Sequence, residues 1–77
     1  MIVKEVRKKF KKGTRKWCIL VGVEDNLDKA YSTASRSMDE LILAFSDDEK
    51  EKYSFNKLRL GVIPLVGGRY TIEVSYG

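Results

Sequence analysis

The last part of the chain alternates apolar and polar residues, and this alternation constrains the fold more than any other pattern. In residues 69–76 the aromatic and aliphatic side chains stand at even positions and the polar side chains at odd positions. A period of two is typical of a β-strand with one buried face. Residues 57–65 alternate similarly, and Gly67-Gly68 lies between the two stretches. The sequence therefore predicts a hairpin over residues 57–76, with Pro64 at an edge or bulge because proline donates no ladder hydrogen bond.

The first part of the chain also fits a hairpin. If Lys12-Gly13 forms a two-residue turn between residues 2–10 and 14–23, most apolar side chains gather on one face. That face holds Ile2, Val6, Phe10, Trp17, Ile19, Val21 and Val23. Slipping the register by one residue would scatter this set. We therefore predict a second hairpin over residues 2–23, whose second strand is apolar on both faces and central in the sheet.

Residues 26–53 have helical periodicity. Apolar side chains recur every three or four positions, as one stripe of a helix requires. The stripe consists of Leu27, Tyr31, Ala34, Met38, Leu41 and Phe45. Asp25 or Asn26 could cap this helix, but the Ser/Thr-rich run 32–37 has poor helix propensity. Because residues 37–40 (Ser-Met-Asp-Glu) match a capping box, a helix that begins near residue 38 remains an alternative. A further capping box at residues 46–49 predicts a short helical turn to about Tyr53.

Together these elements predict one small α+β domain spanning residues 1–77. The expected order is β-β-α-β-β, with an N-terminal basic hairpin (2–23), a helical region (26–53) and a C-terminal hairpin (57–76). The economical architecture is an antiparallel sheet with one main helix packed on one face. A chain of 77 residues forms only a thin core, so every element has to contribute to it.

Positive charge is concentrated at the start of the chain. Residues 1–16 hold eight Lys and Arg against one Glu, a net charge of +7, whereas residues 17–77 carry −3 and the total is +4. Such asymmetry favours an anionic partner, either nucleic acid or an acidic protein surface. Trp17 could stack on a base if it is exposed, although a core position is favoured. The candidate partner-binding residues are Arg7, Lys8, Lys9, Lys11, Lys12, Arg15, Lys16 and Trp17.

The residues that usually carry catalysis are scarce. The chain has no histidine and a single cysteine, Cys18, so neither a His-based catalytic pair nor a zinc site is expected. Gly67-Gly68 lacks the context of a phosphate loop and is explained by a turn. The acidic run 47–51 is explained by a helix N-terminus, where carboxylates are favoured. We therefore predict a protein that is not an enzyme and needs neither cofactor nor metal.

The leading hypothesis is a nucleic-acid-binding module that uses the basic hairpin. The alternative is a protein-binding inhibitor or regulator, since the size, the lysine-rich start and the lack of catalytic residues resemble small accessory proteins of phages and mobile elements. A thin core and exposed strand edges also make a homodimer through a sheet edge plausible. The lone cysteine, the absence of an apolar leader and the absence of a membrane-spanning stretch predict a cytoplasmic protein.

Overall fold

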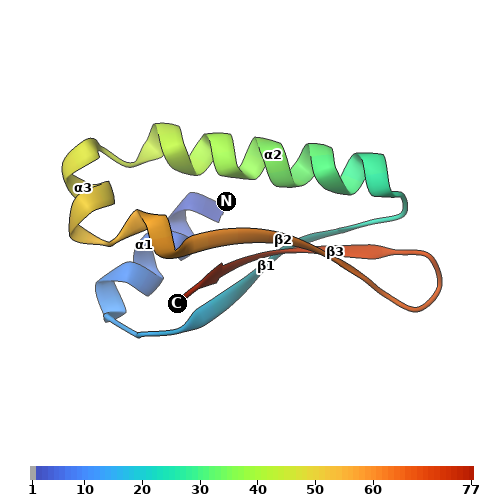
Figure 1. The fold of residues 1–77 in the computed structure, drawn as a ribbon, viewed down its shortest axis with the longest axis horizontal. Helices are drawn as coiled ribbons and strands as arrows, with labels where there is room; N and C mark the ends of the chain where they lie inside the picture. The colour runs from blue at the N-terminus through green and yellow to red at the C-terminus, as the bar shows by residue number, and fades with distance from the viewer. Residues whose placement is uncertain (1) are drawn as a thin grey trace.

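The computed structural model describes residues 2–77, which form a two-layer arrangement of helices on a sheet, measuring 40 × 22 × 19 Å (Figure 1). The α+β class and the antiparallel sheet are confirmed, but the predicted order β-β-α-β-β is wrong. The prediction had four strands and one main helix, whereas the structure has three strands, three helices and a short 3-10 turn. The elements are α1 (Ile2–Lys12), β1 (Trp17–Glu24), α2 (Leu27–Ala44), α3 (Asp47–Lys52), η1 (Phe55–Lys57), β2 (Leu58–Pro64) and β3 (Tyr70–Tyr76).

The largest correction concerns residues 2–12, which form helix α1 and not the first strand of a hairpin. Ile2, Val6 and Phe10 are four residues apart, and a spacing of four puts side chains on one face of a helix as well as of a strand. Val3 distinguishes the two, because it packs against the same core cluster as Val6 and Phe10, which only a helical period permits. The lysine-rich composition of this segment also favours a helix over a strand.

Gly13 ends α1 and does not form a hairpin turn. Its backbone has a φ of 71°, in the left-handed region that glycine adopts without steric cost. Its N–H donates to the carbonyl of Phe10 at 3.1 Å, as expected of the residue that follows a helix. Basic residues in the last turn, Lys9, Lys11 and Lys12, interact favourably with the negative end of the helix dipole. The glycine was correctly recognised as a chain reversal, but the element before it was misassigned.

The three strands form an antiparallel sheet in the order β1-β3-β2. The C-terminal hairpin is confirmed: Leu58 pairs with Tyr76 and Pro64 with Tyr70, around the positive-φ residues Gly67 and Gly68. Pro64 lies at the end of an edge strand, as predicted. The strand predicted over residues 14–23 begins at Trp17, and it is an edge strand and not the central one. Because β1 pairs only with β3, the central position belongs to β3.

Helix α2 is continuous from Leu27, so the alternative of a helix beginning near residue 38 is wrong. The Asn26 side chain accepts a hydrogen bond from the N–H of Lys29 at 2.8 Å, which confirms the predicted N-cap. The Ser/Thr-rich run is helical, and within it buried Ser37 satisfies its hydroxyl by donating to the carbonyl of Thr33 at 2.8 Å. The predicted capping box at Ser46 and Glu49 is also confirmed, and α3 ends at Lys52.

The buried stripe of α2 is only partly the predicted one. Ala34, Leu41 and Phe45 are buried as expected, whereas Leu27 and Tyr31 are exposed. Their places in the core are taken by two smaller side chains, Ala30 and Ser37. Small residues allow the helix backbone to approach the sheet closely.

Both α1 and α2 pack on the same face of the sheet (Figure 1). Val6 and Phe10 from α1, Leu41 and Phe45 from α2, and a row of strand residues form the main core. The strand residues are Trp17, Ile19, Leu58 and Val74. On the opposite face of the sheet the side chains of Leu20, Val23 and Ile63 are exposed. The sheet therefore has one buried face and one open face.

Candidate functional site

The basic residues predicted to bind a partner lie on a helix and on the segment that follows it. Lys4, Lys8 and Lys12 succeed one another at intervals of four, on the side of α1 opposite buried Val6 and Phe10, and all three lysines are exposed. Lys11 is also exposed, and Lys9 is partly buried. The exposed lysines therefore form a positively charged stripe along α1.

The Arg7 guanidinium is engaged by three contacts within the protein. Its guanidinium forms an ion pair with Glu49, donates to the carbonyl of Ala44 at 3.2 Å, and lies over the ring of Phe45 at 4.4 Å from the centroid. The backbone N–H of Ser46 and, after it, the Arg7 guanidinium hold the pKa of Glu49 below its ordinary value. Arg7 thus links α1 to the corner between α2 and α3.

Trp17 belongs to the core. It is 8% exposed, its ring stacks on Tyr76 with centroids 5.2 Å apart, and Phe10 contacts it edge-on at 5.4 Å. Both aromatic contacts come from within the protein, so the indole is not presented on the surface as a base-stacking platform. Its indole N–H is buried without an acceptor in the part of the chain that the structure describes.

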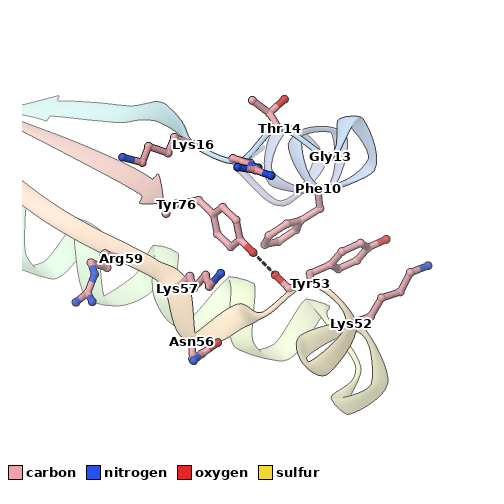
Figure 2. Close-up of a pocket in the computed structure, with 12 residues that line it drawn as sticks. Phe10, Gly13, Thr14, Lys16, Lys52, Tyr53, Asn56, Lys57, Arg59 and Tyr76 are labelled. Carbon is pink, nitrogen blue, oxygen red and sulfur yellow. Dashed lines mark hydrogen bonds between the residues drawn. The ribbon is translucent and has the colours of Figure 1, made fainter.

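An open cleft of about 770 Å³ lies at one end of the molecule. Figure 1 shows why it forms there: the end of α1, the α3 region and the end of β3 converge at that end, and the β2–β3 loop lies at the other. Figure 2 shows that its walls come from segments far apart in sequence. The lining residues are Phe10, Gly13, Thr14, Arg15, Lys16, Lys52, Tyr53, Asn56, Lys57, Arg59, Tyr76 and Gly77.

Five of the cleft residues are cationic, and we call them the cleft cations: Arg15, Lys16, Lys52, Lys57 and Arg59. No Asp or Glu is among the lining residues within the described range 2–77. The salt bridges found within that range join Arg7 to Glu49, Lys29 to Asp25, and Lys50 to Asp47. None of them engages a cleft cation. The cleft is therefore a concentration of positive charge without internal neutralisation.

Aromatic rings form the floor of the cleft. Phe10 stacks on Tyr53 with centroids 4.7 Å apart and planes 5° from parallel, and contacts Tyr76 edge-on at 5.2 Å. The Tyr76 hydroxyl donates to the carbonyl of Tyr53 at 2.6 Å, the bond dashed in Figure 2. The ammonium of Lys52 lies 5.5 Å from the Tyr53 ring centroid. The three rings therefore form one contiguous aromatic cluster in the lining of the cleft.

The structure brings together only part of the predicted set. Arg15 and Lys16 line the cleft. Arg7 and Trp17 contact other parts of the protein. The other predicted residues, Lys8, Lys9, Lys11 and Lys12, lie on α1. Sequence reasoning missed Lys52, Lys57 and Arg59. The missed residues are scattered between acidic and apolar neighbours, so local charge density gave no signal for them. The sheet order brings them close, because the starts of β1 and β2 flank the end of β3.

The lone cysteine, Cys18, is not among the residues that line the cleft. Cys18 is exposed on the open face of the sheet, 3.6 Å from a Glu73 carboxylate oxygen. Desolvation and then the charge of Glu73 raise the pKa of its thiol, which disfavours the nucleophilic thiolate. Within residues 2–77, no group of three or more Cys, Asp or Glu side chains is placed to hold a metal ion.

Comparison of the chain with protein-family models, curated protein sequences and solved structures found no significant match. Over the described residues, no helix combines the length and the apolar character needed to cross a bilayer.

Proposed function

We propose that this protein is a non-enzymatic nucleic-acid-binding module that holds the phosphate backbone in its cationic cleft. The observation that carries the proposal is the set of five cleft cations, which surround a concave surface and form no ion pair within residues 2–77. Lys and Arg side chains bind phosphates by neutralising them and releasing condensed counterions. The binding surface differs from the predicted hairpin, because it joins residues 15–16 to residues 52–59.

A regular polyanion suits this site better than a single acidic group. The cleft cations come from the segment before β1, from α3, from η1 and from β2, so they are spread around the opening. A chain of phosphates would contact several of them in succession. The exposed lysines Lys8, Lys11 and Lys12 on α1 extend the positive field beyond the cleft. Such a field also accelerates association with an anionic partner.

Binding is expected to be largely independent of base sequence. Phe10, Tyr53 and Tyr76 contact one another in the floor, so their ring faces are largely occupied. Of the lining side chains, only Thr14 and Asn56 offer neutral aliphatic polar groups for base edges. We expect the cleft cations to contact phosphates, and phosphate contacts carry no sequence information.

The test is fluorescence anisotropy with labelled single-stranded and duplex oligonucleotides at about 50 mM salt, where counterion release is most favourable. The double variant K57E/R59E reverses two cleft cations. The matched control R36E/R69E makes the same change in net charge at exposed residues outside the cleft, on α2 and beside the β2–β3 loop. We expect K57E/R59E to lose binding and R36E/R69E to retain most of it.

Two outcomes would overturn the proposal. Absence of binding by the unmodified protein under these conditions would exclude nucleic acid as its partner and favour an acidic protein surface. Equal losses in both double variants would show that only net charge matters and that the cleft is not the binding site.

A further inference from the structure

The outer edge of β1 is an unpaired strand edge eight residues long. In the sheet order β1-β3-β2, β1 has a neighbour on one side only. No other backbone hydrogen bond of residues 2–77 reaches Trp17–Glu24. The backbone groups that point away from β3 therefore lack protein partners, and such an edge is a template for another strand.

This edge also lacks most of the devices that keep strand edges from pairing. Natural edges are protected by proline, by charged side chains such as lysine within the strand, or by a β-bulge. Before Glu24, β1 has only the bulge between Leu20 and Gly22. The other edge strand, β2, has Arg59 in its ladder and ends in Pro64. In contrast, β1 reads Trp-Cys-Ile-Leu-Val-Gly-Val before its first charged residue, Glu24. The two edges of the same sheet are thus protected to different degrees.

The charges that flank β1 are complementary to a second copy of the strand in one direction. Arg15 and Lys16 directly precede the strand, and Glu24 and Asp25 end it. An antiparallel neighbour would bring the basic end of each copy to the acidic end of the other, twice by symmetry. A parallel neighbour would bring like charges together, which is unfavourable for residues placed opposite one another.

The bulge in β1 makes full antiparallel overlap compatible with the two faces of the sheet. Pairing with β3 shifts by one residue between Leu20 and Gly22. The face that packs on the helices therefore holds odd-numbered residues of β1 before the bulge and even-numbered residues after it. Trp17 and Glu24 lie opposite Tyr76 and Tyr70, which share a face of β3. By the same reasoning Cys18 and Val23 share the open face, opposite Ser75 and Thr71. In full antiparallel overlap, residue 17 lies opposite 24 and 18 opposite 23, so the faces match.

We propose that β1 pairs antiparallel with β1 of a second copy, in full overlap, to form a continuous six-stranded sheet. The twofold axis then passes near the bulge, so exposed Leu20 of each copy lies close to the axis and exposed Val23 lies opposite the partner's Cys18 on the open face. Lys16 lies opposite the partner's Asp25. Because the two strands run in opposite directions, the cationic clefts lie at opposite ends of the assembly. This inference does not rest on the proposed function.

Cross-linking tests the register directly. Residues opposite each other in antiparallel strands have Cα atoms about 4.5–5.5 Å apart, within the range of a disulfide. In V23C the introduced thiol would face the partner's Cys18, and we expect oxidation to give a covalent dimer. The protein with Cys18 alone should stay uncross-linked, because five positions, or about 17 Å, separate the two Cys18 residues. V66C, at the 99% exposed loop tip, is the control for random thiol collisions.

Charge exchange tests the direction of pairing. At low salt and without nucleic acid, sedimentation velocity should show a dimer whose dissociation constant rises about tenfold or more in E24K/D25K. The fourfold variant R15E/K16E/E24K/D25K exchanges both charges and should restore the dimer. Circular dichroism would verify that each variant is folded. A monomer at all accessible concentrations, cross-linking through Cys18 alone, or no rescue by the fourfold variant would overturn the proposal.

Discussion

The dependence of binding on salt gives the most quantitative test of the cationic cleft. If each of the five cleft cations neutralises one phosphate, the slope of log affinity against log salt is about −4.5 for duplex DNA and about −3.5 for a single strand. Raising salt fourfold, from about 50 to about 200 mM, then weakens duplex binding about 500-fold.

Removing two of these cations should make the slope shallower by a calculable amount. In K57Q/R59Q three cleft cations remain, so the duplex slope falls to about −2.7 and the same change in salt weakens binding only about 40-fold. The control R36Q/R69Q removes two charges outside the cleft and should keep the original slope. Anisotropy titrations at four salt concentrations would measure all three slopes. A weaker affinity with an unchanged slope would show that Lys57 and Arg59 do not contact phosphates, and would refute the reasoning.

Three further predictions concern the fold. Leu41 is completely buried, so Leu41→Ala should lower the free energy of unfolding by about 2–5 kcal/mol, measured in urea; a loss below about 1 kcal/mol would show that the core refills the cavity. Ser46→Ala removes the side-chain acceptor of the α3 capping box and should cost about 1 kcal/mol, whereas Ser46→Asp should restore most of it. Because the pKa of Glu49 is lowered in the folded protein, its ionised form stabilises the fold above its ordinary value of 4.5, and this contribution is lost as the pH falls through the folded pKa. The stability gap between the unmodified protein and Glu49→Gln should therefore narrow on acidification, and a constant gap from pH 6 to 3 would contradict this linkage.

Those parts of the fold that depend on local signals were predictable from the sequence. The strict alternation of residues 69–76 and the Gly67-Gly68 turn identified the C-terminal hairpin, because a period of two is specific to strands. The Ser46 capping box identified the start of α3, and Asn26 was one of two residues predicted to cap α2, because a cap is a short-range interaction between neighbouring residues. In each case the decisive contacts lie within a few residues of one another.

The parts that failed depend on ambiguous spacing or on tertiary contacts. The spacing of Ile2, Val6 and Phe10 fits one face of a strand and one face of a helix equally. Only the position of Val3 and the lysine-rich composition favoured a helix for residues 2–12, and these are weaker signals. The cleft could not be found from charge density, because it is assembled only when β3 joins the starts of β1 and β2. Arg7 likewise looked like a surface cation, and only its distant partner Glu49 shows otherwise.

The central position of β3 has a consequence for how the protein folds during synthesis. β1 and β2 both pair with β3 and not with each other, and Trp17 meets Tyr76 across 58 intervening residues. Neither of the earlier strands has its ladder partner until β3 has been translated and has left the ribosome. Until then α1 and α2 can form, but both edges of β1 and of β2 remain unpaired. Sheet formation is therefore a late event that depends on contacts distant in sequence. Such contacts slow folding and leave unpaired strand edges exposed for longer.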